Sequence, residues 1–179
     1  MASVVIAGDT SGAITLSAPA VAGTNTITLP TSTGTMMVNG PTFSATLASG
    51  SVTITSATWT KMQLNSEGWD TANCYDPTTN YRFTPNVAGY YQVNVGVDAG
   101  LSTNFTQTVA SIYRNGSIFR AGSNVVTGNN LNFVSVVSAL VYLNGTTDYI
   151  EAYAYISATT ARYASSVATW FDAAMIRSA

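Results

Sequence analysis

The stretch that decides the fold lies in residues 81–97, which read Tyr81-Arg82-Phe83-Thr84-Pro85-Asn86-Val87-Ala88-Gly89-Tyr90-Tyr91-Gln92-Val93-Asn94-Val95-Gly96-Val97. From Gly89 onward, every second residue is large and apolar, and this set consists of Tyr91, Val93, Val95 and Val97. The residues between them are mostly polar or small. A period of two is typical of a β-strand that buries one face. We therefore predict a half-buried antiparallel strand over residues 89–97.

The rest of the 179-residue chain has a similar character. Thr, Ser, Asn, Gly, Val and Ala dominate, ten residues are Tyr, and turn residues recur at intervals of about ten. These features predict an all-β sandwich or barrel. We expect further strands over residues 13–16, 24–30, 42–47, 51–55, 61–65, 131–143 and 149–156, and a turn-rich stretch around Trp69, Cys74 and Asp76.

The scarcity of charge excludes several functions. Only 8% of the residues are charged, against roughly 25% in ordinary soluble domains, and the net charge is −2. The sequence therefore has no basic patch for nucleic acid. It has no His, which removes the usual general base and the commonest metal ligand. The lone Cys74 is expected to be a small buried apolar residue. We expect no signal peptide and no membrane insertion, because long apolar runs are missing.

Two segments carry apolar side chains where a sandwich strand would be polar. In residues 131–143 both faces are apolar, and the second face holds Val134, Val136, Leu140 and Tyr142. In residues 149–156, Tyr149, Tyr153 and Tyr155 form a row opposite the expected core face. We predict that both sets lie in a subunit interface. An exposed cross-strand tyrosine ladder is the alternative for the tyrosine row.

Several segments resemble a known family. They are Phe43-Ser44-Ala45, the run from Tyr81 to Tyr91, Tyr113-Arg114-Asn115-Gly116, the run from Val141 to Ile150, and Phe171-Asp172-Ala173-Ala174-Met175-Ile176. In order and spacing, residues 41–179 resemble the globular head of complement component C1q and its tumour-necrosis-factor-like relatives. The resemblance implies a ten-strand jelly roll that forms a homotrimer. The last strand departs from the family's Phe-x-Gly pattern, and no acidic cluster marks a calcium site, so we expect no metal and no cofactor.

Residues 1–40 have a different character, with short strands that cannot bury a core alone. The run from Gly8 to Thr35 resembles a segment common in tail-fibre and other structural proteins of tailed bacteriophages. The resemblance implies a virion-anchoring and trimerising segment ahead of the knob in residues 41–179. Val4, Val5 and Ile6 are the candidate anchor, as an extended strand that adds to a sheet edge of another virion protein. A frayed terminus is the alternative.

Catalysis has little support in the sequence. Glu67 and Asp70 lie near Trp69 and could form the carboxylate pair of a glycosidase, but acidic residues in a turn-rich stretch are more often used for local hydrogen bonds. We therefore expect a binding protein and no enzyme. Neutral loops rich in amides, hydroxyls and rings suit glycans, although each such residue could also be merely solvated. The candidate receptor contacts are Trp69, Tyr75, Asn104, Asn129, Arg162 and Tyr163.

Together these features predict a bacteriophage virion protein. It would be a trimeric fibre or spike whose knob binds a host-surface glycan or protein during adsorption. The alternative is a capsid decoration or head-fibre protein that has an architectural role and no specific receptor. In either case we expect the protein to be made in the bacterial cytoplasm and to sit on the tail or capsid surface.

Overall fold

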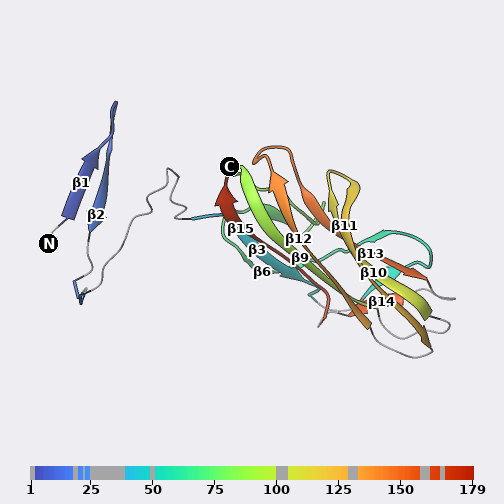
Figure 1. The fold of residues 1–179 in the computed structure, drawn as a ribbon. Coiled ribbons are helices and arrows are strands. Elements are labelled where there is room, and N and C mark those ends of the chain that lie inside the picture. Colours follow the sequence, from blue (N-terminus) through green and yellow to red (C-terminus); the bar gives the residue numbers. More distant parts are fainter. Residues whose placement is uncertain are drawn as a thin grey trace. The chain divides into compact units, whose positions relative to one another are not determined.

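The computed structural model describes residues 3–17, 20–21, 23–24, 39–48, 51–99, 105–128, 133–157, 162–165 and 168–179. The chain divides into two compact units, Met1–Thr35 and Met36–Ala179. Both can be followed in Figure 1. Of the strand expected over residues 24–30, Thr24 lies in a turn and residues 25–30 lie outside the described residues.

The described residues form β-strands joined by turns, which confirms the all-β prediction. The strands are β1 (Ser3–Ala7), β2 (Ala13–Ser17), β3 (Thr42–Thr46), β4 (Ser51–Ile54), β5 (Thr60–Lys61), β6 (Ser66–Asp70), β7 (Tyr75–Asp76), β8 (Arg82–Phe83), β9 (Gly89–Ala99), β10 (Phe105–Arg114), β11 (Ser117–Gly128), β12 (Phe133–Leu143), β13 (Ile150–Ser157), β14 (Arg162–Ser165) and β15 (Trp170–Ser178).

The N-terminal unit contains an antiparallel hairpin of β1 and β2. Val4 pairs with Leu16, and Ile6 pairs with Ile14. The turn between the strands is closed by a hydrogen bond from Gly8 N to Gly12 O, and Gly12 has a φ of 78°, which suits glycine. The segment expected to be a free anchoring strand is therefore already paired along one edge.

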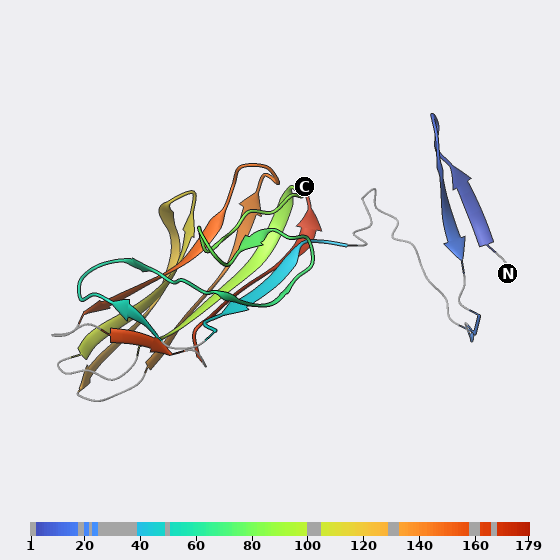
Figure 2. The same cartoon turned by 180° about the vertical axis from the view of Figure 1, so that it is seen from behind.

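The unit Met36–Ala179 is a sandwich of two antiparallel sheets, seen from both sides in Figures 1 and 2. The first sheet has the order β4-β14-β9-β15-β3-β6, and β12 also pairs with β9. The second sheet has the order β11-β10-β13-β8-β7, and β5 also pairs with β13. We call this unit the knob.

The core lies between the two sheets. The alternation predicted for residues 89–97 is confirmed, because Tyr91, Val93, Val95 and Val97 are fully buried. Phe43 of β3 packs on the rings of Phe83 and Phe171, with centroids 4.6 and 4.8 Å away. Contacts of this kind add to the stabilisation from burying each ring.

One glycine of β9 makes room for a large side chain on the outward face. A Cβ atom at Gly96 would lie 2.4 Å from Nε1 of Trp170 on the neighbouring strand β15. The departure from the family pattern in the last strand is therefore accommodated. Trp170 occupies the space over Gly96, while Phe171 and Ala173 still face the core.

One strand prediction and part of one turn prediction between residues 61 and 77 were wrong. The strand expected over residues 61–65 is only the short β5, and part of the expected turn-rich stretch forms β6. β6 is an edge strand that pairs with β3 across a bulge between Ser44 and Ala45. Its Glu67, Gly68 and Trp69 are exposed, so no alternation of apolar residues marks it in the sequence.

A network around Asp148 ties the β10–β11 turn to the loop before β13. The Asp148 carboxylate accepts hydrogen bonds from Arg114 Nη2 at 2.8 Å, from Asn115 Nδ2 at 2.7 Å and from Asn144 N at 3.1 Å. The bond from Asn115, with the charge of Arg114, lowers the pKa of this carboxyl. Asn115 and Gly116 both have positive φ, as a tight type I′ turn requires.

We predict that Asp148→Asn lowers the free energy of unfolding by about 2 kcal/mol at pH 7, because the charged partners lose their acceptor. A lowered pKa stabilises the fold above the ordinary carboxyl value of 3.8, and this stabilisation disappears as the pH falls below it. Urea unfolding from pH 7 to pH 3 should therefore show the variant and the natural chain converging. Glu67→Gln on the exposed edge is the control, and a pH-independent gap would contradict the prediction.

Candidate functional site

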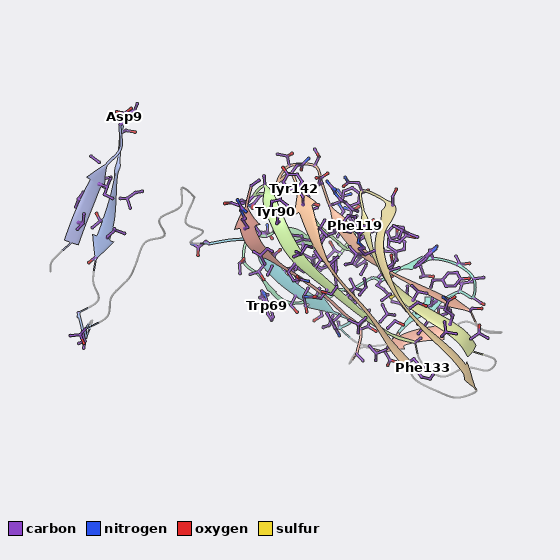
Figure 3. All side chains as sticks on the ribbon, in the orientation of Figure 1. Asp9, Trp69, Tyr90, Phe119, Phe133 and Tyr142 are labelled. Carbon is purple, nitrogen blue, oxygen red and sulfur yellow. The ribbon has the colours of Figure 1, made fainter. Side chains whose placement is uncertain are left out.

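The outward face of the first sheet is apolar along β12 and the start of β9. Tyr142 lies opposite Tyr90 in the register, with ring centroids 5.5 Å apart. Both residues are labelled close together in Figure 3. Leu140 is the most exposed of the set at 58%. We call the set the apolar face; its members are Tyr90, Val134, Val136, Leu140 and Tyr142. The face contains all four β12 residues predicted for an interface, and their contact with another subunit stays a prediction.

A polar row crosses the middle of this face. Gln92 Nε2 donates to Ser138 Oγ at 2.7 Å, and Ser138 Oγ donates to Asn94 Oδ1 at 2.8 Å. Asp172 pairs with Asn94 in the register of β15 and β9. Burial raises the pKa of Asp172, and its Oδ1 has no hydrogen-bond partner among the described residues. The outward surface therefore offers both apolar and hydrogen-bonding groups.

The predicted tyrosine row does not lie on the apolar face. Tyr153 and Tyr155 belong to β13 of the second sheet, and their neighbours Ala152 and Ala154 are in the core. Both rings therefore project from the opposite side of the sandwich. The two predicted interface sets therefore lie on different sides of one protomer, because alternation distinguishes inward from outward without identifying the sheet. Contact of either set with another subunit stays a prediction.

The tyrosine row instead takes part in an aromatic and charged cluster. The Tyr153 ring stacks on Tyr113 at 3.8 Å, and Tyr155 lies 5.2 Å from Trp59. The Arg82 guanidinium lies over the Tyr149 ring at 4.4 Å. Beneath the rings, Lys61 Nζ pairs with the buried Glu151 carboxylate. The cluster matches the alternative of a cross-strand tyrosine ladder.

The six candidate receptor contacts differ in exposure and in whether the structure describes them. Trp69 is 54% exposed on β6, and Figure 3 shows it at the edge of the knob. Tyr75 was a wrong choice, because it is only 5% exposed and its hydroxyl donates to Leu64 O at 2.7 Å. Its ring stacks on Phe43, and burial raises its pKa. Asn104 and Asn129 lie outside the described residues, as do the side chains of Arg162 and Tyr163 in β14.

A cleft of about 570 Å³ lies beside β3, the strand that pairs with β6 and its Trp69. Trp69 Nε1 donates to Thr42 Oγ1 at 3.4 Å, and Thr42 lines the cleft. The full lining is Asn39, Gly40, Pro41, Thr42, Thr71, Ala72, Asn86 and Val87. It contains no charged side chain. No sequence signal marks this cleft, because its residues come from three separate segments, and only the neighbouring Trp69 stands out.

Asp70 and Cys74, two potentially reactive groups near Trp69, have structural roles. Asp70 accepts hydrogen bonds from the backbone N–H groups of Ala72 and Tyr75, so it holds a turn in the way expected for acidic residues there. Cys74 is buried, as predicted. Within the described ranges, no three Cys, Asp or Glu residues gather where they could hold a metal ion. No helix among the same residues is long and apolar enough to cross a membrane.

Comparisons with known proteins identify the fold. No protein-family model and no curated protein matches the chain. Among solved structures, the globular domain of zebrafish complement 1qA protein matches with a TM-score of 0.60 and 12% identity, covering 79% of this chain and 100% of that one. Eiger TNF from S. frugiperda matches with a TM-score of 0.60 and 12% identity, covering 78% and 93%. Murine APRIL at pH 5.0 matches with a TM-score of 0.56 and 10% identity, covering 77% and 100%.

The knob is therefore a C1q/TNF-like jelly-roll sandwich. At 10–12% identity, the likeness establishes the fold alone. The three structures come from animal proteins and lend no support to a role in a virion.

We predict that Tyr153→Ala lowers the free energy of unfolding of the knob by about 2 kcal/mol, because it removes a stacked ring from the cluster. Tyr153→Phe keeps the ring and should stay within about 0.5 kcal/mol of the natural chain. Urea unfolding provides the measurement. A change of oligomeric state without a loss of stability would contradict this prediction and show that Tyr153 contacts another subunit.

Proposed function

We propose that the chain is one protomer of a homotrimeric binding protein on the surface of a bacteriophage. The knob would bind a saccharide or protein on the host cell, and the N-terminal unit would attach the trimer to the particle. The observation that carries the proposal is the apolar face, which a single C1q/TNF-like sandwich leaves exposed.

The apolar face supports association because five exposed apolar side chains gather there and charge is nearly absent. Along β9 and β12, Asp98 is the one charged residue. Exposed groups of large apolar side chains mark contact sites on proteins. The resemblance of the knob to C1q and TNF-like heads implies that the occupant is a second and a third copy of the chain.

The cleft near Trp69 supports binding of a neutral saccharide. Its lining supplies the amides of Asn39 and Asn86 and the hydroxyls of Thr42 and Thr71. Such groups hydrogen-bond to sugar hydroxyls, and the exposed Trp69 ring suits the apolar face of a sugar. Weak binding at each site is sufficient, because three sites per trimer and many trimers per particle act together.

The N-terminal sequence supports a place on a virion. Residues 8–35 resemble segments of phage tail-fibre proteins, and the exposed side chains of Val4, Val5 and Ile6 are available to a partner. Electron microscopy of particles labelled through this chain locates it. Attachment at the tail supports host recognition, whereas regular copies over the capsid support the alternative of a decoration or head-fibre protein.

We predict that Leu140→Asp dissociates the trimer, because assembly would bury an unpaired charge. Native mass measurement at micromolar concentration should give three times 18.7 kDa for the natural chain and 18.7 kDa for the variant. Thr58→Asp, at an exposed turn, should leave the trimer intact. A natural chain that is monomeric at that concentration would overturn the trimer.

We predict that Trp69→Ala weakens host-cell binding at least tenfold, because it removes the aromatic surface beside the cleft. Trp69→Tyr keeps an aromatic ring and should retain most of the binding. The assay measures how well the purified trimer blocks adsorption of the phage. Equal blocking by the Ala variant and the natural trimer would exclude Trp69 from the receptor site.

A further inference from the structure

The N-terminal hairpin has one strongly apolar face. Directly paired residues of antiparallel strands project to the same side of a sheet. The pairs Val4–Leu16 and Ile6–Ile14 therefore place four aliphatic side chains together, and Ile14 is 68% exposed. The opposite side holds Val5 and otherwise small or hydroxyl-bearing residues. The candidate anchor is thus divided, with Val4 and Ile6 on one side and Val5 on the other.

This hairpin lacks a core of its own. A two-stranded hairpin is marginally stable in water, and stability normally requires further strands or a packed layer. All the residues of β2 are exposed, so the apolar side chains remain uncovered within the hairpin. Some other surface has to cover Val4, Ile6, Ile14 and Leu16 for the hairpin to persist.

We infer that this face packs against the same face of two other copies of the chain, so that three hairpins enclose a small apolar core. The inference rests on the proposed trimer and adds a second site of association, separate from the knob. The three hairpins would form a short threefold stalk, held together by twelve aliphatic side chains, four from each copy.

Charge and size both favour copies of the chain as the occupant. Within residues 3–17, Asp9 is the one charged side chain, and it lies in the turn, beyond the paired strands. Identical faces can therefore approach without like charges directly opposed. The two pairs on the face, Val with Leu and Ile with Ile, are similar in bulk, so three copies can pack at similar depth along a common axis.

The covalent link between each hairpin and its knob also favours association of the hairpins. Each hairpin is joined covalently to its own knob, because β2 and the knob belong to one chain. Once three knobs assemble, the three hairpins are held in one particle, and their effective concentration toward one another rises. A face too small to hold free hairpins together is sufficient under this condition.

Cysteine cross-linking in the full chain tests the inference. The one natural cysteine, Cys74, is buried in the knob. Ile14→Cys places a thiol on the apolar face, and Thr15→Cys places one on the opposite face, one residue along the same strand. After mild oxidation, Ile14→Cys should form disulfide-linked dimers up to two-thirds of all chains, because a trimer contains one pair and one single thiol. Thr15→Cys should form at least fivefold fewer.

A second pair of variants protects the test against a local folding defect. Leu16→Cys lies on the apolar face and Ser17→Cys on the other, and they should reproduce the same contrast. Hydrogen exchange provides an independent measurement. The amides of β1 and β2 should exchange at least tenfold more slowly in the natural trimer than in Leu140→Asp, because separating the knobs removes the tether.

The outcomes separate this inference from the proposed function. If the natural chain is monomeric, the proposed trimer itself fails. If the chain is trimeric but both members of each cysteine pair cross-link equally, the hairpin inference is overturned while the knob trimer stands. Rapid exchange of the hairpin amides in an intact trimer would overturn it in the same way, and the face would then belong to the attachment protein on the particle.

Discussion

The structure of the knob depends on the position of β9 in the first sheet. β9 pairs along its whole length with β12 and along most of it with β15, so its two faces are fixed by two neighbours at once. One face supplies Tyr91 and three valines to the core. The other face aligns Tyr90 with Tyr142 and Asn94 with Ser138. A shift by one residue would exchange the two faces, so the same register determines both the core and the outward surface.

The two strands that form the apolar face carry less charge than the rest of the knob. The ion pairs Lys61–Glu151 and Arg114–Asp148 belong to the second sheet and its loops. Arg82 and Arg120 lie on strands of the same sheet. By contrast, β9 and β12 have one charged residue between them. The first sheet also carries Glu67 and Asp70 on β6 and Asp172 and Arg177 on β15, so the deficit does not extend over the whole sheet. β9 and β12 are the strands that the proposed assembly covers.

The sequence was sufficient to predict the strands whose side chains alternate, and it was insufficient where the partner strand decides. The inward face of β9 follows directly from its period of two, whereas β12 is apolar on both faces. The outward position of Tyr153 could be predicted, but its sheet could not, because the sheet to which β13 belongs depends on long-range pairing with β10. Tyr75 has polar neighbours in the sequence, which is typical of a loop residue. In the fold its ring stacks on Phe43, which lies 32 positions (75 − 43) earlier, and it is therefore part of the core.

The polar row restricts the positions in which another surface can pack on the apolar face, which its hydrophobic residues alone do not. Aliphatic side chains pack in many relative positions, whereas buried hydrogen-bonding groups are satisfied in few. Gln92, Asn94 and Ser138 already bond to one another, and Asp172 beside them has a raised pKa because burial disfavours its charged form. A carboxyl whose pKa is raised by folding stabilises the folded state most when the pH is below its ordinary pKa. This stabilisation declines as the pH rises through the raised pKa. Assembly over Asp172 would remove more water and raise that pKa further. Any facing subunit must therefore either supply a hydrogen-bond donor to Asp172 or leave it protonated, and this requirement restricts the register in which the faces can meet.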